Sequence, residues 1–168
     1  MTAAVPVVGF VGRSGSGKTT LLELVVAALS AAGVRVAVIK HTHHRALRLD
    51  ASGKDTARFH EAGAAHVTLF APDQVVHRRR YTEEPPLDEV LAGVREVDLI
   101  LVEGYKRGLF PKLEVVRAAC DPAPLPEIVG RCAWVTDVPT LDEGLPRLPL
   151  DDIASVTAFI RARFLEEG

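Results

Sequence analysis

A phosphate-binding loop is the feature that most constrains this chain. Residues 12–19 read Gly-Arg-Ser-Gly-Ser-Gly-Lys-Thr, which fills every fixed position of the motif G-x-x-x-x-G-K-[ST]. The loop follows a β-branched and aromatic run at 5–11 and opens a segment with helical periodicity at 18–32. This order of strand, loop and helix is the context in which the motif binds phosphate. A glycine-rich turn before an ordinary helix is therefore the weaker interpretation.

The chemistry of the motif assigns roles to its residues. Glycines let the backbone pass close to a phosphate and turn its N–H groups inward, and the helix N-terminus adds positive potential. Lys18 supplies a cation to the β- and γ-phosphates and is a catalytic candidate, and the hydroxyl of Thr19 is placed to bind Mg²⁺. The predicted nucleotide-binding residues of this loop are Gly12, Arg13, Ser14, Gly15, Ser16, Gly17, Lys18, Thr19 and Thr20.

Strands and helices alternate along the rest of the chain. Further strands are predicted at 34–39, 99–102, 112–116 and 132–135, and further helices at 54–62, 87–94 and 151–165. The alternation implies βαβ units. We expect an α/β protein with the three-layer fold of P-loop NTPases, in which a mainly parallel sheet has helices on both faces.

A β-hairpin interrupts this pattern. Residues 66–70 and 74–79 flank Ala-Pro-Asp, which predicts a hairpin inserted into the parallel core at about 66–80. The proline-rich stretches 118–126 and 139–149 are predicted loops. At roughly 150 residues per domain, the 168 residues are expected to form a single nucleotide-binding domain over 1–168.

Composition excludes several classes of protein. The net charge is −2, which argues against a protein built to wrap nucleic acid. No apolar run approaches the roughly 20 residues of a membrane span, and the N-terminus lacks the basic region of a signal peptide. Cys120 and Cys132 form no metal-spaced or disulfide-type pattern. We expect a soluble cytoplasmic protein with no nucleic-acid or membrane partner.

An acidic partner for the magnesium ion is expected at the end of a neighbouring strand. Asp98 begins and Glu103 ends the apolar run at 99–102, so the two carboxylates lie about 16 Å apart and only one can reach the site. Ligands bind at the carboxyl ends of strands in open α/β sheets. Glu103 is therefore predicted to be the metal ligand and a catalytic residue, and Asp98 to have a structural role at the far edge.

A histidine-rich segment leaves the second predicted strand on the same edge. It contains Lys40, His41, His43 and His44, for which contact with an anion or a partner, a zinc site and a plain solvated loop are all open. Zinc is disfavoured because no cysteine is near and a flexible H-x-H-H offers poor tetrahedral geometry. Asp50 follows and is a candidate second carboxylate for the metal.

Recognition of the base has a weaker signal. The chain has no Asn-Lys-x-Asp motif, but Thr136 and Asp137 end a late strand at the correct edge. The carboxylate of Asp137 is able to accept the paired N–H groups of guanine. An ordinary turn-initiating aspartate before Val138 and Pro139 is an equal alternative.

Several of these motifs together resemble the molybdopterin-guanine dinucleotide biosynthesis protein B (MobB) family. The stretch Lys-His-Thr-His-His and the stretch Leu-Val-Glu-Gly-Tyr-Lys are more selective than the phosphate loop. The resemblance extends over nearly the whole chain and rests on residues 12–20, 39–44, 53–55, 62–65, 98–106 and 136–139.

The resemblance implies a homodimeric GTP-binding protein with weak GTPase activity. Such a protein assists a separate guanylyltransferase that attaches GMP to molybdopterin, in the biosynthesis of the molybdenum cofactor. By resemblance, Thr19, Asp50 and Glu103 form the Mg²⁺ shell, and the hairpin after residue 66 helps to join two protomers. The segment with Lys40, His41, His43 and His44 is then the candidate contact for the partner or for the pterin phosphate.

Two other function classes are compatible with the sequence. One is an ATP-dependent small-molecule kinase or ligase, in which Arg78, Arg79 and Arg80 would close over the transferred phosphate. This arginine run lies on a predicted hairpin, where its charges also serve to block edge pairing. The other class is a module that binds nucleotide without turning it over.

Overall fold

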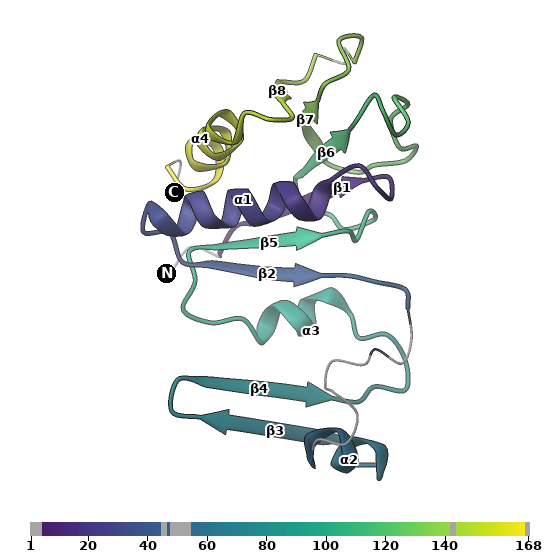
Figure 1. The fold of residues 1–168 in the computed structure, drawn as a ribbon, viewed down its shortest axis with the longest axis vertical. Coiled ribbons are helices and arrows are strands. Elements are labelled where there is room, and N and C mark those ends of the chain that lie inside the picture. Colours follow the sequence, from purple (N-terminus) through teal and green to yellow (C-terminus); the bar gives the residue numbers. More distant parts are fainter. Residues whose placement is uncertain (1–4, 45–46, 48–54, 142–143, 167–168) are drawn as a thin grey trace. The chain divides into compact units, whose positions relative to one another are not determined.

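The computed structural model of the chain describes residues 5–44, 47, 55–141 and 144–166. Contacts divide it into two compact units, of which the first comprises residues 1–42 and 95–168 and the second residues 43–94. Each unit contains a sheet of its own, and the strands of both sheets are labelled in Figure 1.

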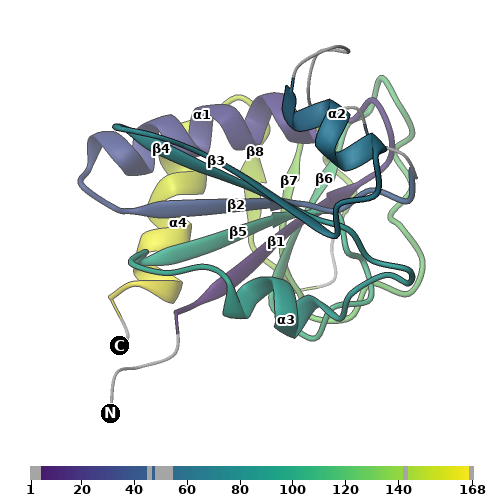
Figure 2. The same cartoon turned by 90° about the horizontal axis from the view of Figure 1, so that it is seen from below.

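The first unit is built on a six-stranded parallel sheet in the order β2-β5-β1-β6-β7-β8. Its strands are β1 (Val7–Gly12), β2 (Val36–Lys40), β5 (Leu99–Glu103), β6 (Lys112–Val116), β7 (Arg131–Thr136) and β8 (Arg147–Pro149). Its helices are α1 (Lys18–Ala31) and α4 (Ile153–Phe164). Figure 2 shows α1 running alongside β1, β2 and β5. The predicted α/β class with a mainly parallel sheet is confirmed.

An apolar cluster joins this sheet to its two helices. Alternate residues of the central strands, such as Phe10 and Leu101, pack with Val25 and Leu29 of α1 and with Ile160 of α4, and all five are fully buried. Burying each such side chain contributes about 1.5–3 kcal/mol. The central strands are therefore held firmly, and so are the ends from which the site is built.

The carboxyl ends of the parallel strands meet at one edge of the sheet. Register pairs Lys40 with Glu103, Glu103 with Phe10, and Gly12 with Val115. The phosphate loop leaves β1 at this edge. Glu103 and the phosphate loop are consequently neighbours although they are far apart in the sequence.

The opposite edge of the same sheet holds an exposed ion pair. Oδ1 of Asp98 lies 2.6 Å from Nη2 of Arg35, and Oδ2 accepts a hydrogen bond from the Arg35 backbone N–H at 2.8 Å. The hydrogen bonds from Arg35 lower the pKa of Asp98 to about 2. Asp98 thus joins the start of β5 to the start of β2, in the structural role expected for it.

Strand β6 contains a buried ion pair inside an apolar surround. Glu114 is 1% exposed and lies 2.7 Å from Nη2 of Arg131 on β7. Its Oε1 also accepts the backbone N–H of Leu125 at 2.6 Å, and the Arg131 guanidinium stacks 4.3 Å from the ring centre of Trp134. The pair therefore fixes both the β6–β7 contact and the return of the loop between them.

One predicted loop is partly wrong. The stretch 139–149 was expected to be a loop throughout, but residues 147–149 form β8, which pairs with β7. Leu148 is its single half-buried apolar residue, between exposed Arg147 and Pro149. Three residues with one apolar side chain and a proline give no readable alternation, although they are enough for an edge strand.

The second unit contains the predicted hairpin. Its elements are α2 (Asp55–Glu61), β3 (His66–Ala71), β4 (Gln74–Arg79) and α3 (Leu87–Ala92). The strands pair antiparallel from His66 opposite Arg79 to Ala71 opposite Gln74, so Pro72 and Asp73 form the turn. Part of the arginine run is bonded locally, because Arg79 lies 2.8 Å from Glu89.

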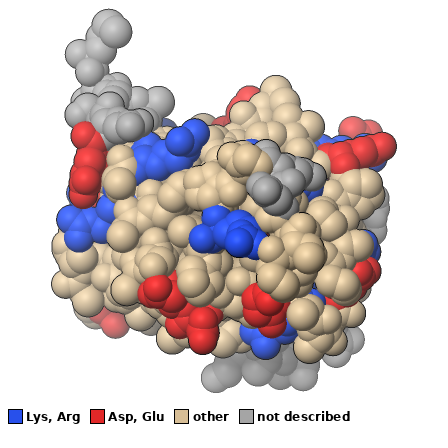
Figure 3. Space-filling view, turned by 90° about the horizontal axis from the view of Figure 1, so that it is seen from above, with Lys and Arg blue, Asp and Glu red and all other residues tan. Residues whose placement is uncertain are grey.

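Two surface properties concern partners. Over the face drawn in Figure 3, Lys and Arg side chains are interspersed with Asp and Glu side chains. Among the described residues, no helix has the length and apolar character that crossing a membrane requires.

Candidate functional site

The phosphate loop joins β1 to α1 through two glycines that other residues would not replace. At Gly12, an added Cβ would lie 2.4 Å from the carbonyl oxygen of Val115. Gly17 precedes the helix at φ 86°, and a Cβ there would lie 3.0 Å from Nη2 of Arg117. Positive φ and close backbone approach are what a loop needs in order to wrap around a phosphate.

Lys18 lies over this loop. Its Nζ donates a hydrogen bond to the carbonyl oxygen of Arg13 at 2.6 Å. Burial lowers the pKa of Lys18 below its ordinary value, while the charge of Glu103 opposes that shift. A partly desolvated ammonium inside the loop gains from an incoming anion.

The N-terminus of α1 offers further donors. Among the described residues no side chain caps it, and its first turn contains no acidic residue. The N–H groups of a first helical turn have no acceptor within the helix. The hydroxyl of Ser16 is buried and has no partner within the part of the chain that is described. These donors fit a phosphate group, which would satisfy them together.

Three side chains meet beside the start of α1. The Thr19 hydroxyl donates to Oε1 of Glu103 at 2.9 Å, and Nζ of Lys40 lies 3.2 Å from Oε2 of the same carboxylate. Glu103 is 8% exposed. Hydroxyl and carboxylate oxygens are the ligands that Mg²⁺ prefers. The structure thus brings together two of the three predicted metal ligands, and Asp50 lies outside the described residues.

The loop after β6 supports the phosphate loop from outside. Nε of Arg13 lies 2.8 Å from Oδ2 of Asp121, and Cys120 Sγ donates to the carbonyl oxygen of Ser14 at 3.3 Å. Nε of Arg117 donates to the carbonyl oxygen of Ser16 at 3.4 Å. No sequence motif indicates these supporting residues. The contacts span about a hundred positions, and a proline-rich loop has no periodicity that would reveal them.

The residues expected to read the base lie at the end of β7. Oδ1 of Asp137 accepts the backbone N–H of Ala118 at 2.7 Å, and the Thr136 hydroxyl accepts the N–H of Val138 at 2.9 Å. Asp137 is exposed, whereas Thr136 is 7% exposed. Asp137 therefore joins the loops after β6 and β7, and Thr136 shapes the turn.

The histidine-rich segment is divided between the two units. Lys40 ends β2 beside Glu103, and the ring of His41 meets the ring of Tyr105 edge-on at 5.0 Å between centroids. His43 and His44 belong to the second unit. Lys40 is thus part of the site itself.

Comparison with known sequences identifies a family. A sequence model of the family described as "Molybdopterin guanine dinucleotide synthesis protein B" matches residues 7–137. A relative from Haemophilus influenzae, named molybdopterin-guanine dinucleotide biosynthesis adapter protein, is 42% identical over 131 residues. That alignment covers 76% of this chain and 72% of the relative. A protein of the same name from Escherichia coli is 34% identical over 163 residues, with 93% and 91% covered.

Solved structures agree with these sequence matches. A MobB protein homolog from Bacillus stearothermophilus has a TM-score of 0.71 and 31% identity, with 94% of this chain and 99% of that chain covered. Bacillus subtilis MobB has a TM-score of 0.73 and 26% identity, with 92% and 96% covered. The resemblance first drawn from short motifs is thereby confirmed, and the chain belongs to the molybdopterin guanine dinucleotide synthesis protein B (MobB) family.

Proposed function

We propose that this protein binds GTP together with Mg²⁺ at the phosphate loop. The observation that supports this most directly is the contact between Thr19 and Glu103, which joins the first turn of α1 to the end of β5. A hydroxyl and a carboxylate at this distance, beside Lys18, match what a nucleoside triphosphate with its metal requires.

The chain's own groups have distinct tasks in this proposal. Lys18 and the N–H groups of the loop hold the β- and γ-phosphates, and Thr19 and Glu103 hold the metal, with Asp50 as a further ligand. Mg²⁺ bound there supplies positive charge to the phosphate oxygens. Asp137 accepts the N–H groups of guanine through the carboxylate oxygen that does not bond Ala118.

Hydrolysis is expected to be slow. Enzymes that hydrolyse GTP rapidly orient the attacking water with a dedicated side chain, commonly a glutamine. Tyr105 and Lys106 stand after Glu103 in this chain instead. The protein is then a slow GTPase whose main task is to present nucleotide.

The family supports a proposal for the biological role of the protein. The curated relatives are named as adapter proteins of molybdopterin-guanine dinucleotide biosynthesis. We infer that this protein assists a guanylyltransferase in attaching GMP to molybdopterin. The segment with Lys40, His41, His43 and His44 is the proposed contact for that partner or for the pterin phosphate.

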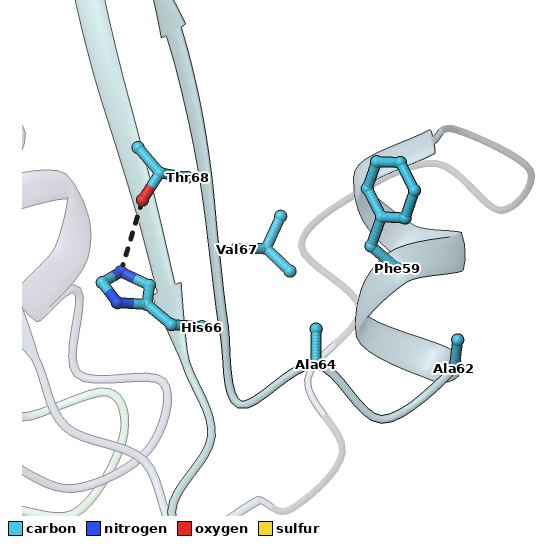
Figure 4. A pocket seen from close by; sticks show the side chains of 6 residues that line it. All are labelled: Phe59, Ala62, Ala64, His66, Val67 and Thr68. Carbon is cyan, nitrogen blue, oxygen red and sulfur yellow. Dashed lines mark hydrogen bonds between the residues drawn. The ribbon is translucent and has the colours of Figure 1, made fainter.

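The hairpin is the proposed dimer contact. Leu69, Phe70, Val75 and Val76 on β3 and β4 are between 49% and 79% exposed. Beside the hairpin is an open pocket of about 460 Å³ (Figure 4), where Phe59 of α2 and Val67 of β3 contribute apolar walls. Exposed apolar surface on a two-stranded sheet favours pairing with a second copy.

Calorimetry with GTP and ATP, each with and without Mg²⁺, tests the nucleotide proposal. Tighter binding of GTP that depends on Mg²⁺ supports it. A preference for ATP, or transfer of the γ-phosphate to a small acceptor, would instead favour an ATP-dependent kinase or ligase. Bound GTP that stays intact for many hours with Mg²⁺ present would indicate binding without turnover.

A further inference from the structure

Lys40 lies where the magnesium ion of the proposed function is expected. Its Nζ is 3.2 Å from Oε2 of Glu103 and 3.5 Å from Oγ1 of Thr19. These oxygens belong to the two described side chains that are predicted to bind the metal. The ammonium group of Lys40 therefore competes with a divalent metal ion for the carboxylate of Glu103.

The register of β2 with β5 places the lysine there. Lys40 is the last residue of the strand and pairs in register with Glu103, so both side chains leave the same edge of the sheet on the same face. Glu103 is 8% exposed, and a buried carboxylate needs a neutralising charge. The Lys40 side chain is 58% exposed, so its ammonium can move into water without rearranging the core.

We propose that Lys40 is a built-in counter-ion that occupies the metal position of Glu103 and Thr19 until Mg²⁺ displaces it. The inference rests on the magnesium site of the proposed function. Lys40 is then a positioning residue, because its ammonium neutralises the carboxylate of Glu103 and does not touch the reacting atoms.

A linkage between metal and nucleotide follows. Mg²⁺ alone must displace an ammonium from Glu103, so it binds weakly to the nucleotide-free protein. A triphosphate brings negative charge that attracts the displaced ammonium, so nucleotide and metal favour each other's binding. Such coupling is reciprocal by thermodynamic necessity.

Binding of Mn²⁺ to the nucleotide-free protein tests this inference. Electron paramagnetic resonance at low ionic strength measures free Mn²⁺ directly, with no contribution from catalysis. Lys40→Met keeps an unbranched side chain that is one atom shorter and removes its charge. We expect it to bind Mn²⁺ about fivefold more tightly than the wild-type protein does. Lys40→Gln also removes the charge but can still donate to Glu103, and it should shift the Mn²⁺ affinity in the same direction. It replaces the methionine variant if that variant folds poorly.

Two further variants make the comparison specific. Arg35→Met removes one positive charge from the other end of β2, where Arg35 pairs with Asp98, and should leave Mn²⁺ affinity unchanged. Adding Glu103→Gln to Lys40→Met should abolish the gain. Equal or weaker Mn²⁺ binding by both Lys40 variants overturns the inference.

The two proposals fail in different ways. If the wild-type protein binds GTP with Mg²⁺ but loss of the Lys40 charge leaves Mn²⁺ affinity unchanged, only the counter-ion is wrong. If the Lys40 variants gain Mn²⁺ affinity while no form of the protein binds GTP, the counter-ion stands and the nucleotide proposal fails.

Discussion

Asp98 and Glu103 flank the same apolar strand core, yet their surroundings give them opposite tasks. Asp98 and its partner Arg35 lie in water, where one ion pair contributes little to stability. Glu103 is nearly buried and faces the Thr19 hydroxyl and the Lys40 ammonium. A buried carboxylate must be neutralised, and this requirement makes it suited to binding a metal.

Lys18 is the residue whose loss should affect nucleotide binding most. We expect Lys18→Ala to weaken GTP binding by about 100-fold, because a charge-assisted contact to the phosphates is lost in a partly desolvated loop. Calorimetry measures the affinity. Lys106→Ala removes a neighbouring cation and is the matched control. Unchanged affinity in Lys18→Ala would contradict the assignment of the phosphate loop.

Asp137 allows a test of base recognition. We expect Asp137→Asn to lower GTP affinity about tenfold and to leave ATP affinity unchanged, because an NH₂ group, which donates and cannot accept, replaces the carboxylate oxygen proposed to face guanine. The amide oxygen can still accept the Ala118 N–H, so the loop is preserved. The exposed Asp151→Asn serves as the control. If the ratio of GTP to ATP affinity does not change, Asp137 is a turn residue only.

At the scale of elements, β6 and β7 depend on one buried ion pair. We expect Glu114→Gln to lower the free energy of unfolding by about 3 kcal/mol, since the buried charge of Arg131 loses its partner. Urea denaturation measures the change, and the exposed Glu23→Gln on α1 is the control. A loss below about 1 kcal/mol would show that water or Trp134 compensates for the charge.

The Arg35–Asp98 contact between β2 and β5 should be visible in acid. The pKa of Asp98 is about 2, against an ordinary 3.8. Asp98 therefore stabilises the fold above pH 3.8, and this contribution is lost as the pH falls toward 2. The wild-type protein should therefore lose stability relative to Asp98→Asn across that interval. Unfolding measured from about pH 5 to about pH 2 tests this. If the free energy of unfolding changes with pH in the same way for the wild-type protein and Asp98→Asn, the prediction is contradicted.

The elements that the sequence predicts well are those set by local chemistry. The phosphate loop needs glycines at fixed spacing, and short β-branched apolar runs such as the one before Glu103 are typical of buried strands, so β1, α1 and β5 were predictable. The contact of Lys40 with Glu103 was predictable only in part. Both residues end strands at one edge of the sheet, but the strand order that makes them neighbours is set by the whole sheet.

Other parts depend on contacts that have no local pattern. Asp121 reaches Arg13 across more than a hundred residues, and no periodicity within a proline-rich loop indicates such a pairing. β8 exists because β7 offers it a free edge, not because its three residues prefer extended structure. Lys112 looked like an ordinary strand residue but is fully buried, and its Nζ donates to backbone carbonyls, among them that of Val129.

At the scale of the whole molecule, the dimer proposal makes a prediction about mass. We expect a particle of twice the 18.1 kDa of one chain by light scattering, because the hairpin leaves Leu69 and Val76 exposed as a cross-strand pair. Val76→Glu should shift the protein to monomer. Leu109→Glu changes an apolar side chain that is 91% exposed on the first unit and is the control. Monomeric wild-type protein, or equal effects of both variants, would contradict the hairpin contact.

The loop between β6 and β7 divides into a fixed part and a free part. Arg117, Ala118, Cys120 and Asp121 each bond the phosphate loop or the end of β7, and Leu125 is bonded to Glu114. Lys112 holds Val129 and Gly130 at the other end of the loop. Surface loops ordinarily tolerate extra residues, and here the longer stretches without such contacts are residues 122–124 and 126–128. Length variation among natural relatives should therefore fall in these two stretches, and either is a place to insert a fluorescent or affinity tag without disturbing the site.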